Sequence, residues 1–345
     1  MTSNLVSADI GLADHSIWRL PGQLCALRPD ATQLLDRVNE HAWRTAEPAL
    51  LELMRLRVAC LIGNRAGEAA RSPAARTGDL SEAKINDLPA YPTSTHFSPV
   101  ERECLAFAEQ FVMDVSGMTT AALDVLAHQL GRTELSDFVG ALYAIEFTQR
   151  LQMVAQVLLA PVVEAAAAPA PTSAVADTAK SEPHLDLPMR KVLATYQDAV
   201  VRGQALDSVT TELVRLRCAR THRCRICQTL RLADAQAAGV DETMTAKIDF
   251  YERSDLPERF KVALRITDAF ITRPDSLSET VAEQARSFFS SEQLAELCLD
   301  ITKWSTQKIN VALGTDGADR LPTNKAGVSF FGFDDAGRVA GFWAN

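Results

Sequence analysis

The sequence predicts an all-α protein that consists of two helical domains in tandem, followed by a small C-terminal β-hairpin. Three observations lead to this prediction. Apolar residues recur at the three- and four-residue spacing of helices. An eight-residue motif recurs at an offset of 160 residues. Alternation typical of strands is nearly absent before the last twenty residues.

The chain of 345 residues is long enough for two domains. We expect an N-terminal extension over residues 1–19, a first helical domain over residues 20–160 and a second over residues 185–320. Residues 161–184 are rich in Ala, Pro, Ser and Thr, a composition that cannot build a core, and are predicted to be a linker. Residues 321–345 form a C-terminal tail rich in aromatic side chains.

An internal repeat relates the two predicted domains. Three matches occur in the same order, at slowly drifting offsets of 160, 159 and 158 residues: 52–59 (ELMRLRVA) with 212–219 (ELVRLRCA), 108–111 (AEQF) with 267–270 (TDAF), and 148–152 (TQRLQ) with 306–310 (TQKIN). Repeats of this length indicate that each unit is one small domain.

Helical spacing is clearest in the second domain. Three apolar stripes predict three helices and are expected to pack in the core: Val209, Leu213 and Leu216; Val262, Ile266 and Ala269; and Leu294, Leu297, Ile301 and Trp304.

The tail is predicted to form the hairpin. Residues 328–333 and 338–343 alternate like strands and flank a turn that contains Gly337. The tail carries the aromatic residues Phe330, Phe331, Phe333, Phe342 and Trp343. We expect so aromatic a segment to pack on a neighbouring subunit or to cover a pocket.

Composition excludes several classes of function. The net charge is −9 and no stripe of Lys and Arg offsets it, so nucleic-acid binding is not expected as the main task. We expect neither a secretory signal nor a membrane span, because the first thirty residues lack a basic start followed by an apolar run and no apolar run is long enough to cross a membrane. The seven cysteines are scattered through apolar stretches, which favours a reducing cytoplasm over a disulfide framework. We expect Cys60, Cys104 and Cys298 to be buried.

Cys224 and Cys227 are the most informative pair in the chain. Two thiols separated by two residues can close a disulfide, bind a metal or act as a redox pair. A helix is predicted to start near Cys224 and to continue to Gly239, so both thiols would lie in its first turn. Unpaired N–H groups and the positive end of the dipole favour a thiolate there. Cys224 is expected nearer the exposed end, with Cys227 one turn further in.

Glu212 lies twelve residues before Cys224. Its simplest interpretation is a solvated surface carboxylate. The alternative is that two helices fold back on each other and bring Glu212 beside Cys227 as a proton acceptor, directly or through water.

These residues resemble a known family. Glu212, the Cys224–Cys227 pair and the Ala-rich stretch that ends at Gly239 are similar to the alkylhydroperoxidase D and carboxymuconolactone decarboxylase superfamily. The resemblance covers both repeats and implies helical bundles that assemble into homo-oligomers, here a dimer or trimer of double domains. It implies reduction of a hydroperoxide or of a partner protein's disulfide. By resemblance, Cys227 is the thiol linked to a proton relay, Cys224 is its disulfide partner and Glu212 is the base.

The sequence departs from this family at two places. The family's relay histidine falls on Arg231, which can stabilise a thiolate but cannot carry a proton. His222 is a possible substitute, or else a residue that caps a helix end. In the first repeat, Asn64 and Gly67 stand where the second has its thiols. We therefore expect the first domain to be a structural pseudo-subunit, with a pocket wall or a regulator site as alternatives.

The predicted function is that of a cytoplasmic, antioxidant thiol oxidoreductase or peroxidase that needs no cofactor or metal. A second hypothesis is a non-redox decarboxylase or lactone enzyme, in which Glu212 is the base and Arg231 binds a carboxylate. A third is a catalytically degenerate scaffold. A fourth is a zinc site built from Cys218, His222, Cys224 and Cys227.

Overall fold

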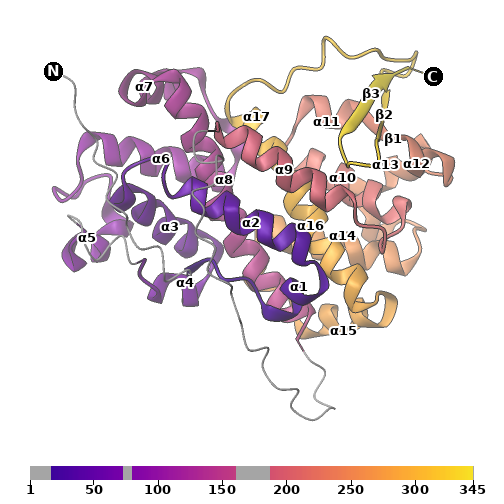
Figure 1. Cartoon of the computed structure of the whole chain (residues 1–345), viewed down its shortest axis with the longest axis horizontal. Helices are drawn as coiled ribbons and strands as arrows, with labels where there is room; N and C mark the ends of the chain where they lie inside the picture. The colour runs from indigo at the N-terminus through magenta and orange to yellow at the C-terminus, as the bar shows by residue number, and fades with distance from the viewer. Residues whose placement is uncertain (1–16, 73–79, 161–186, 345) are drawn as a thin grey trace.

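The computed structural model describes residues 17–72, 80–160 and 187–344 (Figure 1). The predicted linker 161–184 and most of the predicted extension 1–19 lie outside the described residues. The N-terminal half contains α1 (Gly22–Leu27), α2 (Pro29–Ala42), α3 (Pro48–Ile62), α4 (Arg65–Ala69), α5 (Glu82–Asn86), α6 (Pro99–Met113), α7 (Thr120–Leu130) and α8 (Arg132–Leu158).

The C-terminal half continues with helices and ends in strands. Its elements are α9 (Met189–Val201), α10 (Ser208–Thr221), α11 (Arg225–Thr229), β1 (Leu230–Leu232), α12 (Ala233–Ala237), α13 (Glu242–Ala246), α14 (Glu258–Thr272), α15 (Glu279–Phe288), α16 (Ser291–Trp304), α17 (Lys308–Ala312), β2 (Ser329–Phe333) and β3 (Val339–Trp343). The three predicted apolar stripes fall on α10, α14 and α16, which confirms the helical assignment of these segments.

Local signals explain where several of these helices begin. Ser98 and Ser290 each form a capping box, in which the serine hydroxyl accepts from the N3 backbone and the N3 side chain accepts from the serine N–H. Asp207 caps α10 by accepting a hydrogen bond from the backbone of Thr210. These caps satisfy N–H groups that would otherwise lack a partner at the helix start.

A single hydrophobic core joins the two halves. The long helix α8 packs against α9, α14, α15, α16 and α17 of the C-terminal half, and α2 packs along α9 (Figure 1). One cluster of buried residues runs through all of these contacts, from Leu24 in α1 to Ala312 in α17. The two predicted units are therefore held together by shared apolar burial.

No helix of the described chain is long and apolar enough to cross a membrane.

A small three-stranded sheet completes the fold, in the order β1–β2–β3. β2 and β3 are antiparallel, which confirms the predicted hairpin. β1 pairs in parallel with β2, with Leu230 opposite Ser329. The prediction of a helix from Cys224 to Gly239 is wrong at this point, because β1 separates α11 from α12. The protein is thus mostly helical, with a sheet that reaches beyond the hairpin.

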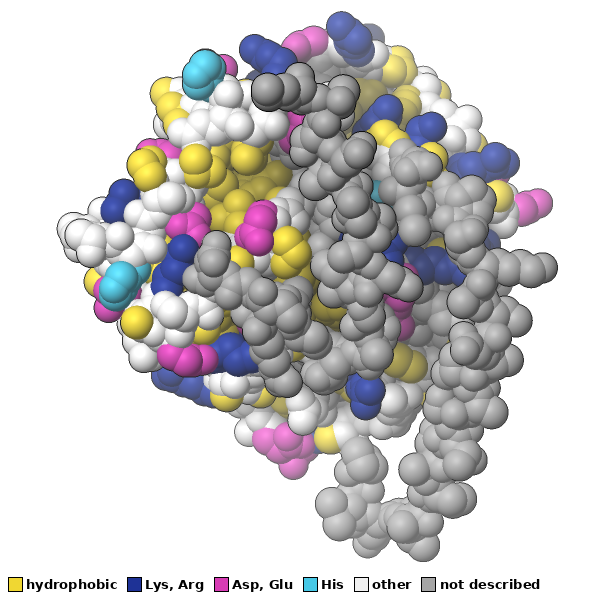
Figure 2. Space-filling model, turned by 60° about the vertical axis from the view of Figure 1, so that its left-hand side comes forward, with side chains coloured by type: hydrophobic (Ala, Val, Ile, Leu, Met, Phe, Trp, Pro, Cys, Tyr) yellow, Lys and Arg dark blue, Asp and Glu magenta, His cyan; other side chains and the backbone are white. Residues whose placement is uncertain are grey.

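The side of the molecule formed by the N-terminal half carries a hollow in which hydrophobic side chains gather (Figure 2). The short helix α11, which carries Cys227, lies in the other half of the molecule (Figure 1).

Candidate functional site

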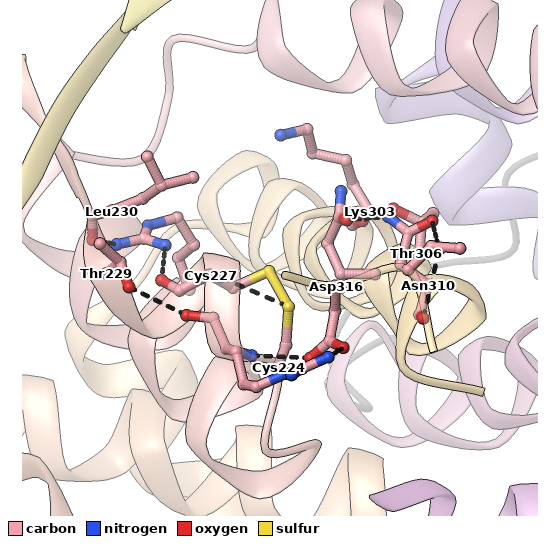
Figure 3. The surroundings of a disulfide bond; sticks show 12 residues. Cys224, Cys227, Thr229, Leu230, Lys303, Thr306, Asn310 and Asp316 are labelled. Carbon is pink, nitrogen blue, oxygen red and sulfur yellow. Dashed lines mark hydrogen bonds and ion pairs between the residues drawn. A yellow bond between two sulfur atoms is a disulfide. The ribbon is translucent and has the colours of Figure 1, made fainter. Parts of the chain in front are cut away.

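Cys224 and Cys227 form a disulfide at the start of α11 (Figure 3). Their Cα atoms are 5.3 Å apart. Cys224 is the N-cap of α11, and its Sγ accepts a hydrogen bond from the backbone N–H of Cys227 at 3.4 Å. The chain reaches this cap through Arg223, whose positive φ of 53° makes the sharp turn between α10 and α11. The local turn and the cap therefore place the two sulfurs next to each other.

The exposure of the two cysteines is the reverse of the prediction. Cys224 is fully buried at 0% exposure, whereas Cys227 is 8% exposed. The helix α11 is short and leads directly into β1, and its first backbone N–H groups are bonded to Asp316. Both cysteines are buried, and Cys227 is the one of the two that lines a cavity.

The start of α11 is held by Asp316. Its carboxylate accepts from the backbone of Arg225 at 2.9 Å and from the guanidinium of the same residue, and its carbonyl accepts from the backbone of Ile226 at 3.0 Å. Two of the N–H groups that were expected to stabilise a thiolate, those of Arg225 and Ile226, thus donate hydrogen bonds to Asp316 instead. Only the N–H of Cys227 points at a sulfur, that of Cys224.

Glu212 is not the solvated surface carboxylate of the simpler interpretation. It is buried, and its carboxylate forms a bidentate ion pair with Arg215 at 2.6 and 2.7 Å. It also accepts from the backbone of Leu232 at 3.3 Å. Arg215 in turn donates to the carbonyls of Cys227 at 2.9 Å and Leu230 at 2.5 Å. Through Arg215, Glu212 therefore holds the backbone of α11 and β1 in place.

The N-terminal half contains the same network without any thiol. Glu52 pairs with Arg55 at 2.7 and 2.8 Å, and Arg55 donates to the carbonyls of Gly67 and Ala70. Glu52 accepts from the backbone of Ser72 at 3.0 Å. The Glu–Arg pair thus also occurs in the half that lacks the two cysteines. Its role common to both halves is therefore to hold the following backbone segment in place.

Arg231 does not lie beside the thiols. It sits on β1, and its Nε and terminal nitrogen bind the carboxylate of Glu242 at 2.8 and 2.9 Å. The prediction placed it one helical turn beyond Cys227, and the strand β1 turns it away. Arg231 lines a cavity of about 320 Å³ together with Glu212 and Gln236.

His222 is a buried residue at the C-terminal end of α10. Its Nε2 lies 3.1 Å from the hydroxyl of Ser305, and its ring meets the edge of Phe147. Burial lowers the pKa of His222 well below its ordinary value, and the nearby charges of Lys308 and Arg150 lower it further. The imidazole is therefore neutral and occupies the helix-end position that was the alternative to a relay role.

A second cavity, of about 160 Å³, lies directly beside Cys227. Its wall combines aromatic and aliphatic side chains with a few polar ones: Gln197, Asp198, Arg215, Ile226, Cys227, Leu230, Lys303, Trp304, Gln307, Phe331, Phe333, Gly337, Val339 and Phe342. Most of the aromatic wall comes from the hairpin. The predicted alternative that the tail covers a pocket therefore matches the structure.

Lys303 is a cavity residue that the sequence reasoning missed. It is only 6% exposed, and its Nζ lies over the rings of Trp304 and Phe333, 4.9 Å from the centroid of Phe333. Burial lowers the pKa of Lys303 well below its ordinary value, although Asp300 opposes this shift. The signal in the sequence was a lysine next to Trp304 at the end of an apolar stripe.

The five remaining cysteines differ in exposure, and Cys25 is half-buried. Cys104, Cys218 and Cys298 are buried, and burial raises the pKa of each thiol to about 12. Cys60 is exposed, so the prediction that it is buried is wrong. Within the described ranges, no group of three or more His, Cys, Asp and Glu side chains is arranged to hold a metal ion.

Two proteins of Mycobacterium tuberculosis are similar to this chain: the uncharacterized protein Rv2313c of strain H37Rv and the uncharacterized protein MT2376 of strain CDC 1551. Each is 34% identical over 261 residues, which cover 72% of this chain and 89% of the relative. The chain belongs to the same family as these proteins. Because 261 residues exceed the length of either predicted domain, members of the Rv2313c family share sequence in both halves. No protein-family model and no solved structure matches the chain.

Proposed function

We propose that this member of the Rv2313c family is a thiol-dependent oxidoreductase of the alkylhydroperoxidase D-like type. It reduces a small hydroperoxide, or a disulfide of a partner protein, with Cys224 and Cys227. The observation that carries the proposal is the asymmetry of the disulfide. Cys227 lines an aromatic-walled cavity, whereas Cys224 is closed off behind it. Dithiol chemistry needs one thiol that the substrate can reach and that attacks the substrate, and a second thiol that is shielded and resolves the intermediate.

The reduction of a hydroperoxide proceeds in two steps. The Cys227 thiolate attacks the peroxide, so that an S–O bond forms, the O–O bond breaks, and the alkoxide leaves as an alcohol after it takes up a proton. Cys227 is now a sulfenic acid. The Cys224 thiol attacks its sulfur, the disulfide forms and water leaves. Two electrons have passed from the dithiol to the peroxide.

An external dithiol completes the cycle. One of its thiolates attacks the accessible sulfur of Cys227 and releases Cys224 as a thiol. Its second thiol then resolves the mixed disulfide, so that the donor leaves oxidised. This requirement fits a reducing compartment such as the cytoplasm, where such donors are maintained.

The two halves are, in this proposal, copies of one alkylhydroperoxidase D-like domain. The repeated Glu–Arg network supports this, as does the cap at the start of α4, where Asn64 accepts from the backbone of Gly67 just as Cys224 accepts from Cys227. The first copy keeps the architecture and has lost the thiols. It supplies an interface that an identical subunit would otherwise supply, and the double domain assembles further into a homo-oligomer.

The non-redox alternative has one observation in its favour, because Glu212 and Arg231 line the same cavity of about 320 Å³. However, Glu212 forms an ion pair with Arg215, and Arg231 forms an ion pair with Glu242. A carboxylate already bound by a guanidinium is a poor base, and a guanidinium already bound by a carboxylate is a poor anion site. These pairings favour the thiol proposal.

The proposal is tested with single substitutions of the two cysteines. We expect Cys227→Ser and Cys224→Ser each to abolish peroxide consumption in the presence of a dithiol donor. Cys60→Ser, which removes an exposed thiol elsewhere, serves as the matched control and should keep full activity. Peroxide consumption unchanged in either site variant would refute the proposal and leave the scaffold hypothesis.

A further inference from the structure

The cavity beside Cys227 contains a buried amine without a polar partner. Lys303 extends from α16 toward the space above Cys227 and Leu230 (Figure 3). Its Nζ makes no hydrogen bond or ion pair with any residue that the structure describes, and its contacts are the rings of Trp304 and Phe333. Burying an amine without a polar partner costs free energy. A lysine that is more than nine-tenths buried and points into a cavity therefore indicates a group in that cavity that binds the amine or exchanges a proton with it.

The charged groups around Lys303 act on its pKa in opposite directions. Asp300 on the same helix and Asp198 on α9 favour the protonated form, while Arg215 on α10 and burial disfavour it. The pKa of Lys303 is lowered by the sum of these effects. A lysine with a lowered pKa can act as a general base, whereas an ordinary surface lysine stays protonated.

The cavity brings the amine and the thiol within reach of one small reactant. Its volume is about 160 Å³, and liquid water occupies about 30 Å³ per molecule. The space therefore holds a few waters or a small organic group, so a proton can pass between Lys303 and Cys227 through a short chain of waters or a bound substrate.

We propose that Lys303 is the acid–base residue of this site and takes the place of the histidine relay that the chain lacks. The inference rests on the proposed thiol function. Lys303 in its amine form accepts the proton of the Cys227 thiol, which leaves a thiolate and an ammonium. The ammonium then gives this proton to the alkoxide as the O–O bond of the hydroperoxide breaks. Lysine returns to the amine, and no further proton donor is needed for that step.

The first measurement is the pH dependence of Cys227 alkylation by iodoacetamide. The full chain carries Cys224→Ser, so that Cys227 stays reduced, and mass spectrometry of its peptide separates it from the other cysteines. We expect the midpoint to lie below the ordinary thiol value of about 8.5. Adding Lys303→Met should raise this midpoint by at least about one pH unit and slow alkylation at pH 7 about tenfold. Lys191→Met, which removes an exposed lysine on α9, is the matched control and should leave the midpoint unchanged.

The second measurement separates proton transfer from charge. Lys303→Arg keeps a positive charge but cannot release a proton at neutral pH. Its peroxide turnover is measured in the otherwise natural chain, and its Cys227 midpoint in the chain that also carries Cys224→Ser. We expect its Cys227 midpoint to stay low while peroxide turnover falls at least tenfold and loses the part of its pH profile that belongs to the lysine. Circular dichroism of each variant checks that it is folded.

Two results would overturn the inference. An unchanged Cys227 midpoint in Lys303→Met would show that Lys303 does not exchange a proton with the thiol. Full turnover in Lys303→Arg would show that only its charge matters. Failure of the thiol function is recognised separately, because the natural chain would then consume no peroxide while the alkylation midpoint still reports on Lys303.

Discussion

At the scale of single residues, Asp300 is a buried carboxyl group whose ionisation the fold opposes. It lies on α16 and accepts a hydrogen bond from the hydroxyl of Thr211 at 3.1 Å. Burial and, to a smaller extent, the charge of Glu296 raise the pKa of Asp300 to about 7, against the attraction of Lys303. In an unfolded chain the same carboxyl group has a pKa of about 3.9. Between these two values the folded protein binds more protons than the unfolded chain.

This difference predicts how stability responds to pH. The contribution of Asp300 to the free energy of unfolding should fall as the pH rises from about 4 to about 7, by at most about 1.4 kcal/mol per pH unit. Asp300→Asn keeps an acceptor for Thr211 but does not ionise. We therefore expect its stability relative to the natural chain to increase steadily from pH 5 to pH 7. Urea unfolding at several pH values measures this, with the exposed Asp335→Asn as a control that should show no such trend. Parallel pH profiles for Asp300→Asn and the natural chain would contradict the assignment.

At the scale of elements, each half contains a helix that fastens a short following segment through a buried Glu–Arg pair. α3 does this with Glu52 and Arg55, and α10 with Glu212 and Arg215. The guanidinium in each case also binds two backbone carbonyls. Removing one partner of a buried ion pair leaves an uncompensated charge.

The two halves therefore offer a matched pair of substitutions. Glu52→Gln and Glu212→Gln should each lower the free energy of unfolding by about 3–5 kcal/mol, because each leaves a buried guanidinium without its carboxylate. Denaturant unfolding compares the two variants directly. If Glu212 were instead a catalytic base, Glu212→Gln would lose peroxide turnover without a comparable loss of stability. A small effect for Glu212→Gln beside a large one for Glu52→Gln would contradict the architectural role.

At the scale of the whole molecule, a buried ion cluster lies where the two halves meet. Glu146 and Arg150 belong to α8, and Lys308 belongs to α17. The Lys308 ammonium binds both carboxylate oxygens of Glu146 at 2.8 Å, and Arg150 binds Glu146 and the carbonyl of Phe270 on α14. Two cations thus share one carboxylate inside the shared core. Burial, opposed by Glu146, lowers the pKa of Lys308 to about 8.

The cluster predicts opposite outcomes for two substitutions. Glu146→Gln leaves two buried cations without a carboxylate and should destabilise the protein by about 3–5 kcal/mol. Lys308→Met removes the surplus cation and leaves the Glu146–Arg150 pair intact, so its effect on stability should be small or favourable. Thermal or denaturant unfolding of both variants measures this. Equal losses for the two variants would contradict the charge balance described here.

The sequence by itself determined the features that depend on neighbouring residues. Helical periodicity placed α10, α14 and α16, because the core-facing stripe of a helix repeats every three to four residues. The turn at Gly337 placed the hairpin. The spacing of Cys224 and Cys227 indicated a possible disulfide, because two residues between thiols allow closure within one turn of chain. These signals are all local in the chain.

Only the tertiary structure decided the features that depend on distant partners. β1 is a strand because Leu230 to Leu232 pair with a segment about a hundred residues later, and three residues carry too short a pattern to predict this. That pairing turns Arg231 toward Glu242 and leaves Cys227, rather than Cys224, facing the cavity. The partner of Glu212 and the placement of Lys303 likewise follow from packing between helices. Spacing along a chain specifies which side chains lie on the same face of a helix or strand, but it does not specify which distant residues pack against that face.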